Sequence, residues 1–374
     1  MRRVQFPVWL VLVAVTAACA DITSPNPWSV QPDITATDVA PPNPVQVYGT
    51  WHCGNDYCTW GAARNLTEFD NMNHWLVDRG NGAPSVNLVV LSFVHPYRLL
   101  KKTTDAQTTN GIPKGMTAGI VNYFKSRGIR VMLSIGGITY VSAWNKALAE
   151  NAAQLGQNAA EAAAALGVGI EIDYEENKNP NLAGLQAFID AYRLVHPYDA
   201  TGTNHAARLT IDLAAGDRWL IVLTRKATAD WLRTDVQVLD YANAMVPARQ
   251  PSVSDAIANW QEHVDGKVQY APPIPPLAPA KFTGSLYVAE GNKVRPECAN
   301  YANSLQKATR SFVEGVAPKG AGTTAGMLGF MFWAAERPAV RGIGTVPPNT
   351  CEGGVGGGAT SLGVTIPMLP LRQQ

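Results

Sequence analysis

The sequence lacks any extended run of charge of one sign. Its 30 Lys and Arg residues nearly balance 29 Asp and Glu residues, so the net charge is +1 over 374 residues. Binding to nucleic acid depends on basic side chains gathered against phosphates, and no basic cluster of that kind occurs. We therefore expect no nucleic-acid partner.

Several motifs that mark other enzyme classes are also missing. The chain has no Gly-rich phosphate loop followed by Lys, no helix motif with paired His and no Gly-x-Ser-x-Gly elbow. Nucleotide hydrolysis, zinc proteolysis and serine hydrolysis therefore have no support. Gly167-Val168-Gly169 resembles part of a dinucleotide fingerprint, but it follows a predicted helix and enters a predicted strand, which reverses the required order. It is better interpreted as a helix stop, and no cofactor is expected.

The apolar run near the N-terminus is short. Two arginines precede Phe6–Val15, which is too short to cross a bilayer and is followed by small residues. This pattern predicts an export signal over residues 1–20. The residues before Cys19 resemble a bacterial lipobox with Thr16 where Leu is usual, so lipid attachment at Cys19 and ordinary cleavage after Ala20 both stay open. A lipid on Cys19 is the one membrane contact that the sequence predicts.

Cysteine is scarce, with 5 in the chain. If Cys19 carries lipid, an even number remains in an oxidising compartment, and disulfides become plausible. Cys53 and Cys58 are close enough in sequence to close one loop, whereas a zinc site needs two well-spaced ligand pairs. We favour local Cys53–Cys58 pairing and expect no metal site. Cys298 and Cys351 stay unassigned.

Composition divides the rest of the chain into three parts. Residues 21–44 are rich in Pro, Ser, Thr and Asp without sustained periodicity, which is typical of a flexible linker. Residues 341–374 form a tail rich in Gly and Pro. Between them, residues 45–340 have the length of one large barrel domain, which we expect to be monomeric.

Within that domain, short runs rich in Val, Ile and Leu alternate with amphipathic helical stretches. This order predicts an α/β fold with a parallel sheet, and eight such runs predict a single (β/α)8 TIM barrel. The predicted strands are Val45–Thr50, Val86–Phe93, Arg130–Ile135, Val168–Tyr174, Arg208–Asp212, Ala242–Val246, Phe282–Val288 and Gly329–Trp333. The clearest predicted helices are Gly115–Arg127, Asn158–Leu166 and Leu182–His196. Chemistry in such a barrel takes place where the strands end.

The fourth predicted strand carries a row of acids. Glu171, Asp173 and Glu175 occupy every second position, so all three point to one face, which in a barrel is the interior. Neighbouring acids on that face are about 7 Å apart, and ionisation of one raises the pKa of the next. A carboxyl that stays protonated can act as an acid. Paired acids that only support the barrel interior are the alternative from alternation alone.

This strand resembles the signature Asp-Gly-x-Asp-x-Asp-x-Glu of the family 18 glycoside hydrolases. Gly169, Asp173 and Glu175 match it, whereas Glu171 replaces the middle Asp and Val168 the first. Two further motifs occur in the family's order on either side. Ser134-Ile135-Gly136-Gly137 resembles its Ser-x-Gly-Gly, and the strand that ends at Trp333 resembles its last strand.

The resemblance implies roles for these residues. Glu175 is implied to be the general acid and later the base toward water, with Asp173 orienting the substrate's 2-acetamido group and Glu171 behind it in a proton relay. In this family the acetamido oxygen, and not an enzyme carboxylate, is the nucleophile. Trp333 is implied to form the floor of the sugar subsite. The implied substrate is therefore a glycan that contains N-acetylglucosamine.

The sixth strand departs from the family pattern. Its Met-x-Tyr-Asp motif aligns with Met245-Val246-Pro247-Ala248, which keeps Met245 but loses the Tyr that helps to hold the acetamido group. Another hydrogen-bond donor must then substitute. The candidates for this substitution are Tyr241, Asn243, Arg249 and Asp212, and the residues expected to line the cleft are Trp51, His52 and His95. A single His at such a position is more often an ordinary hydrogen-bonding residue.

Three hypotheses follow for an extracytoplasmic protein, either anchored or secreted. The first is a retaining glycosidase that acts at N-acetylglucosamine, which Asp173 and Glu175 favour. The second is a catalytically impaired relative that binds glycans, which the lost Tyr favours. The third is a structural surface lipoprotein, which only the linker and the lipobox-like segment support.

Overall fold

The computed structural model describes the central part of the chain. The described residues are 46–53, 65–78, 82, 84, 86–214, 219–245, 253–287, 289–290, 293–294, 311–318 and 325–333. The predicted signal, linker and tail lie outside them, as do four of the cysteines and the side chain of Cys53. The domain boundaries, the lipid site and the disulfide therefore stay predictions.

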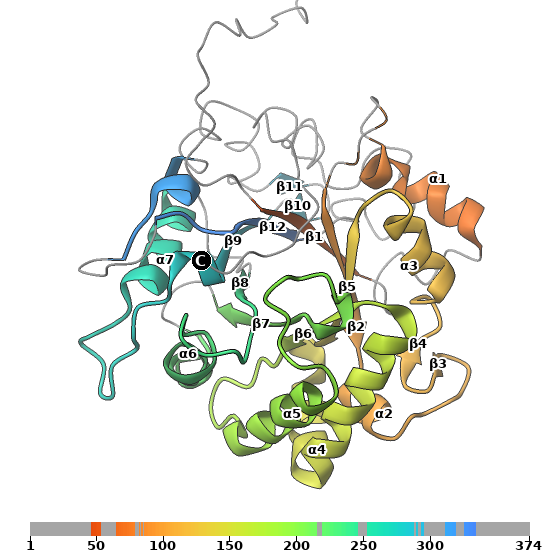
Figure 1. The fold of residues 1–374 in the computed structure, drawn as a ribbon, viewed down its shortest axis with the longest axis horizontal. Coiled ribbons are helices and arrows are strands. Elements are labelled where there is room, and N and C mark those ends of the chain that lie inside the picture. The colour runs from red at the N-terminus through yellow and green to blue at the C-terminus, as the bar shows by residue number, and fades with distance from the viewer. Residues whose placement is uncertain are drawn as a thin grey trace, which may run out of the picture. The chain divides into compact units, whose positions relative to one another are not determined.

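Eight parallel strands close into a barrel in which each strand pairs with the next along the chain and the last pairs with the first (Figure 1). They are β1 (Val47–Cys53), β2 (Leu88–Val94), β5 (Arg130–Gly136), β6 (Gly169–Asp173), β7 (Leu209–Ala214), β8 (Ala242–Met245), β9 (Phe282–Tyr287) and β12 (Gly329–Trp333). Every predicted strand overlaps one of these strands. The predicted (β/α)8 barrel is confirmed.

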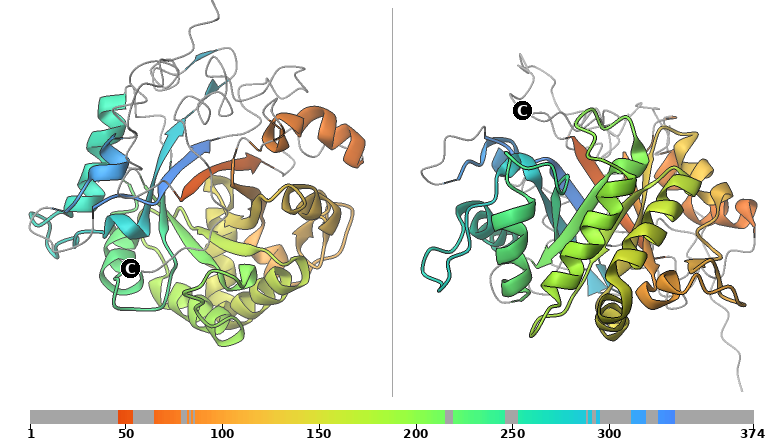
Figure 2. Two further views of the ribbon diagram at one scale, coloured as in Figure 1. Left: turned by 45° about the horizontal axis from the view of Figure 1, so that its top comes forward. Right: turned by 60° about the horizontal axis from the view of Figure 1, so that its bottom comes forward.

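Helices cover the outer face of the barrel (Figures 1 and 2). They are α1 (Leu66–Val77), α2 (Pro96–Leu100), α3 (Ala118–Lys125), α4 (Val141–Leu166), α5 (Leu182–Val195), α6 (Ile221–Lys226) and α7 (Val253–Asp265). Four short helical turns lie between the described elements: η2 (Ile138–Tyr140), η3 (His205–Ala207), η4 (Ala227–Trp231) and η5 (Pro279–Lys281). Two small antiparallel sheets lie outside the barrel. One pairs β3 (Thr108–Thr109) with β4 (Ile112–Pro113), and the other pairs β10 (Ala289–Glu290) with β11 (Lys293–Val294).

The predicted helices correspond to α3, α5 and the second part of α4. Asn151 interrupts α4 with extended φ and ψ of −164° and 82°, and its side chain accepts a hydrogen bond from the backbone N–H of Gln154. The second part of α4 therefore begins with its own N-cap. The helix ends at Gly167, whose φ of 63° suits glycine, as the helix-stop interpretation predicted.

Because successive side chains of each strand point to opposite faces, the buried apolar residues form two separate clusters. Val168, just before β6, and the outward-facing Ile170 and Ile172 of β6 are buried against the helices in the larger cluster. A smaller apolar cluster fills part of the barrel interior and includes Trp51 and Met331. The interior also holds buried polar and charged side chains, and their distribution decides where chemistry can occur.

Candidate active site

Three acids form one row in the barrel interior, two on β6 and one just beyond it. Glu171, in the middle of β6, and Asp173, at its end, are 0% and 3% exposed, and Glu175 comes two residues after the strand. The charges of Glu171 and Glu175 both act on Asp173, which places the three carboxyl groups in electrostatic contact. Val168 packs outward against the helices, so the loss of the first signature Asp leaves this interior row intact.

Glu171 is held by donors from two other strands. Trp51 Nε1 on β1 donates to Glu171 Oε1 at 2.9 Å, and Asn243 Nδ2 on β8 donates to Glu171 Oε2 at 2.6 Å. Thr283 Oγ1 on β9 in turn donates to Asn243 Oδ1 at 2.7 Å, which fixes the orientation of the amide. Glu171 is therefore an anchored acceptor at the centre of the interior.

Asp212 adds a fourth carboxyl group to the row. Ile211 on β7 lies beside Ile172 on β6, so Asp212 comes next to Asp173, and Asp212 is also in register with Asn243. A side-chain hydrogen bond joins Asp212 to Glu171. Two carboxyl groups can form such a bond only by sharing a proton.

Burial favours the neutral form of these acids. It is the main cause that raises the pKa of Asp173 and of Asp212 well above the ordinary value, and the neighbouring carboxylates raise both further. Burial also raises the pKa of Glu171, although its hydrogen-bond donors oppose the shift. The pKa of Glu175 rises to about 7 through burial, against a hydrogen bond from the backbone N–H of Ile138. Glu175 therefore keeps a proton near neutral pH.

The Ser-Ile-Gly-Gly segment shapes the backbone beside these acids. Gly136 has a φ of 125°, and a Cβ on it would lie 1.8 Å from the carbonyl oxygen of Asp173. Only glycine fits there. The N–H of Gly137 donates to that same carbonyl at 3.0 Å, and Trp144 Nε1 donates to it at 3.1 Å. The motif thus brings β5 against β6, and the N–H of Ile138 then reaches Glu175.

Aromatic rings stand beside the acids. Trp333, half-buried at the end of β12, lies 5.7 Å between ring centroids from Phe93 with an interplanar angle of 29°, and 6.3 Å from Trp51. Phe93 was not among the predicted site residues. Its place at the end of a predicted strand was the one signal that could have found it. Trp51 is buried and reaches Glu171 instead of standing free at the mouth.

The other predicted site residues lie at different positions along the barrel axis. Met245 is half-buried at the carboxyl end of β8, two residues beyond Asn243 on the same face. Tyr241 is fully buried and lies two residues before Asn243, toward the amino end of the barrel. This position corrects the expectation for Tyr241, because its hydroxyl cannot reach the mouth to replace the lost Tyr. Arg249 lies outside the described residues.

The two histidines near the mouth have structural partners. His52 Nε2 lies 2.7 Å from Asn73 Oδ1 on α1, and burial lowers the pKa of His52 to about 4. His95 caps α2 by accepting a hydrogen bond from the N–H of Arg98. Both agree with the ordinary hydrogen-bonding interpretation.

The described part of the chain contains no group of three or more His, Cys, Asp or Glu side chains that could hold a metal ion. No helix within it combines the length and apolar composition needed to cross a membrane.

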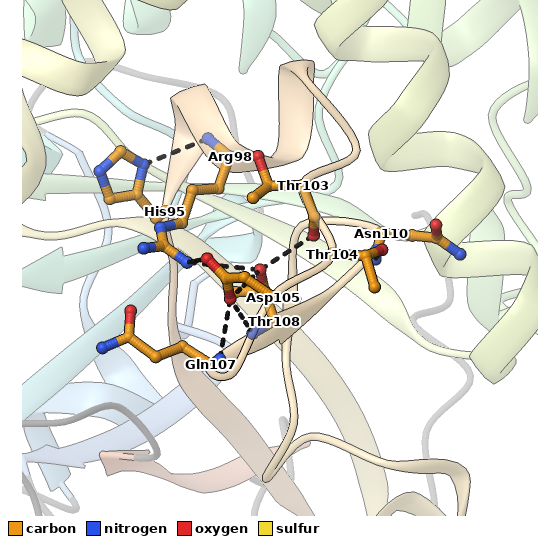
Figure 3. Close-up of polar contacts among 8 residues, drawn as sticks. All are labelled: His95, Arg98, Thr103, Thr104, Asp105, Gln107, Thr108 and Asn110. Carbon is orange, nitrogen blue, oxygen red and sulfur yellow. Dashed lines mark hydrogen bonds and ion pairs between the residues drawn. The ribbon is translucent and has the colours of Figure 1, made fainter.

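A second polar cluster braces the connection between β2 and β5 (Figure 3). Asp105 accepts hydrogen bonds from the backbone N–H groups of Gln107 and Thr108 and pairs with Arg98 Nη1 at 2.6 Å. A cavity of about 560 Å³ lies between this connection and α4. None of the predicted site residues lines this cavity. The cluster around Asp105 supports the connection between β2 and β5 and is separate from the acids.

Comparisons with known proteins agree with this barrel. Neither a protein-family model nor a curated protein sequence matches the chain. A family 18 chitinase from Pseudoalteromonas aurantia aligns with 76% of this chain and 93% of its own length, at 14% identity and a TM-score of 0.50. This likeness shows that the chain has the fold of that chitinase.

Two other solved structures are more distant by TM-score. A chitinase from Rhizomucor miehei has a TM-score of 0.46 at 12% identity, with 76% of this chain and 93% of that chain covered. A family 18 chitinase from Cycas revoluta, solved in complex with (GlcNAc)3, has a TM-score of 0.46 at 11% identity and covers 84% of this chain and 98% of its own.

Proposed function

We propose that the protein is a divergent family 18 type glycoside hydrolase that cleaves β-glycosidic bonds at N-acetylglucosamine. The observation that carries the proposal is the interior row of Glu171, Asp173 and Glu175, which Asp212 extends at the carboxyl end of the barrel. The fold and the order of the motifs support it. The chemistry below rests on these residues.

Glu175 acts as the general acid. With a pKa of about 7 it is largely protonated at mildly acidic pH and can donate that proton to the glycosidic oxygen as the C1–O bond breaks. The substrate's acetamido oxygen forms a bond to C1 from the opposite side and gives an oxazolinium ion. Glu175, now a carboxylate, removes a proton from the water that attacks C1, and the bond between C1 and the acetamido oxygen breaks, which restores the acetamido group. Two inversions retain the β configuration.

Asp173 orients the acetamido group during this sequence. Its carboxylate accepts the acetamido N–H and stabilises the positive charge of the oxazolinium ion, so Asp173 must lose its proton as the reaction begins. Glu171 and Asp212 are close enough to share a proton, and the pair can take up the proton that Asp173 releases. Asp212 therefore acts in the relay, in place of the acid that the sixth strand lacks.

Trp333 provides the sugar-binding surface. Its half-buried ring suits the apolar face of a pyranose, and the stack with Phe93 fixes the ring's orientation. Met245 forms part of the rim. Trp51 contributes indirectly, because its Nε1 holds Glu171 and its ring supports Trp333.

The alternative is a protein that binds the same glycans without cleaving them. It is motivated by Pro247 and Ala248, which stand where the family motif has Tyr and Asp. Without the Tyr hydroxyl, the acetamido group has one fewer donor to hold it in position for attack. The two functions share the aromatic surface and differ in turnover.

Product analysis distinguishes the two functions. The purified protein is incubated with chitooligosaccharides, peptidoglycan fragments and an N-glycan, and the products are identified by mass spectrometry and their anomers by NMR. We expect cleavage beside N-acetylglucosamine with the β-anomer formed first. Binding of one glycan without cleavage would support the alternative, and neither binding nor cleavage would reject both.

An extracytoplasmic location is part of the proposal. It rests on the signal-like residues 1–20 and the linker composition of residues 21–44. Mass spectrometry of the mature N-terminus from fractionated cells tests it. A diacylglyceryl group on Cys19 would establish an anchored protein, and a free N-terminus at Asp21 a secreted one. Size-exclusion chromatography with light scattering tests the expected monomer.

A further inference from the structure

The amino end of the same barrel interior collects hydrogen-bond donors. Arg208 directly precedes β7 and lies two residues before Thr210, on the same interior face. Because Ile211 is in register with Ala242, Thr210 comes next to Tyr241. The three side chains therefore form one patch that begins beside Glu171 and extends toward the amino end, and the Arg208 guanidinium lies 5.9 Å from the Tyr241 ring centroid.

Among the residues that the structure describes, the donors of this patch have no hydrogen-bond acceptor. Arg208 is 2% exposed, and its Nε, Nη1 and Nη2 atoms are buried without a hydrogen-bond partner. The hydroxyl groups of Tyr241 and Thr210 are likewise buried without one. An arginine cannot become neutral by losing its proton at physiological pH. A buried cation needs a partner of opposite charge, because burial removes its hydration.

The neighbouring charges are mainly positive. Arg130, at the start of β5, is also buried and donates Nη2 to the carbonyl oxygen of Gly202 at 2.6 Å. Burial and then the charge of Arg208 lower the pKa of Arg130 to about 10. His205 faces the same group, and burial followed by the charges of Arg130, Lys125 and Arg208 lowers its pKa to about 4. The His205 ring is therefore neutral at pH 7.

The nearby acids already have other partners. Asp240 Oδ2 accepts the backbone N–H of Leu209 at 2.7 Å and pairs with Arg193 Nη2 at 3.1 Å. Asp199 accepts hydrogen bonds from residues of its own loop, among them the backbone N–H of Asn204 at 2.7 Å. Neither carboxylate bonds to Arg208.

We propose that this patch of Arg208, Thr210 and Tyr241 binds a small monovalent inorganic anion, with chloride as the probe. The guanidinium supplies the charge and several N–H donors in a planar fork, and the two hydroxyl groups complete the coordination. A divalent anion is disfavoured because the carboxyl group of Glu171, which is in register with Thr210, acts electrostatically on Tyr241. The anion neutralises the amino end of the interior as shared protons neutralise the carboxyl end.

Thermal unfolding of the full chain tests this site. Protein freed of halide is titrated with sodium chloride or sodium bromide against sodium gluconate, at constant ionic strength and pH 7. We expect a saturable rise in Tm of about 5 °C with halide at about 100 times the dissociation constant. An equal rise with gluconate, or no dependence on halide, would overturn the proposal, because general screening does not distinguish these anions.

Amino-acid substitutions test whether the halide-dependent rise in Tm arises at this patch. Arg208→Met should abolish the halide-dependent part of the Tm, whereas Arg233→Met, at an exposed arginine paired with Asp235, should leave it unchanged. If Arg208→Met does not fold, Tyr241→Phe removes one hydroxyl group and should raise the halide concentration at half-saturation several-fold. Wild-type behaviour in Tyr241→Phe, or anomalous scattering from bromide crystals without a peak beside Arg208, would reject the site.

Discussion

The two ends of one barrel interior carry opposite charges. The carboxyl end holds Asp173 and Asp212, with Glu171 at the centre of the interior, and the amino end holds Arg130 and Arg208. Both rows arise from the same alternation along the strands. The comparison shows that a protein buries acids and arginines by different means. Acids can share protons with one another, whereas an arginine stays charged and must be paired.

The difference also explains which end can do chemistry. A carboxyl group with a raised pKa can release and recover a proton near neutral pH, as Glu175 is placed to do. The amino end offers only fixed donors. The predictions below test this contrast, beginning with the largest expected effect.

Replacement of the proposed general acid should have the largest effect. Glu175→Gln keeps the size of the side chain but cannot donate the proton, so kcat on a chitooligosaccharide should fall by about 10²- to 10⁴-fold while binding persists. The matched control is Glu176→Gln, because Glu176 bonds to Asn145 and to nearby backbone N–H groups. Unchanged turnover in Glu175→Gln would refute the assignment.

The acidic end should lose stability as the pH rises. Folding raises the pKa of Glu175 from 4.5 to about 7, so its folded form binds more protons than its unfolded form within that window. The stabilisation is complete below the lower value and is lost through the higher one, by about 3 kcal/mol for this residue. Urea unfolding at pH 4.5 and 7.5 measures the loss.

Asp212→Asn provides a sharper version of that measurement. Because burial also raises the pKa of Asp212, the substitution should make the decline between these pH values smaller. An identical pH dependence in wild type and Asp212→Asn would show that Asp212 does not take up protons with the row.

The amino end should show the opposite sign. Lys281 precedes β9, and burial lowers its pKa to about 8, so the folded form binds fewer protons than the unfolded form above that value. Its contribution to the free energy of unfolding should rise by about 1.5 kcal/mol between pH 8 and 9.5. Lys281→Met should remove this rise in urea titrations. A wild-type slope in the variant would assign the rise to other groups.

The smallest effect is expected at the aromatic surface. Trp333→Ala should weaken glycan binding by about tenfold, as measured by calorimetry, because it removes one stacking ring. Phe93→Leu, which keeps an apolar contact beside Trp333, should weaken binding less. Equal affinities in Trp333→Ala and wild type would place the sugar elsewhere.

Much of the fold could be predicted because strand and helix periods are local properties. The runs that became β6 and β12 ended within two residues of their predicted bounds. The predicted Asn158–Leu166 helix was too short, since α4 is held by packing against α5 along its length and its second part begins at the cap formed by Asn151. Propensity alone does not reveal such contacts.

The candidate site was predictable where one strand carries it. Glu171, Asp173 and Glu175 share a face because the side-chain period of a strand is two. The position of Tyr241 was not predictable in this way, because alternation shows which face a residue occupies but not its height along the barrel. Pairing of β8 with β7 sets that height.

The sequence by itself therefore determined the barrel, the acidic face of its fourth strand and the order of the motifs around it, since these depend on residue spacing within single segments. Only the tertiary structure decided that Asp212 meets Glu171, that Asn243 and Trp51 hold Glu171, and that Arg208 is buried without an acceptor among the described residues. Those contacts join strands far apart in the chain. Their partners are set by the register at which the barrel closes.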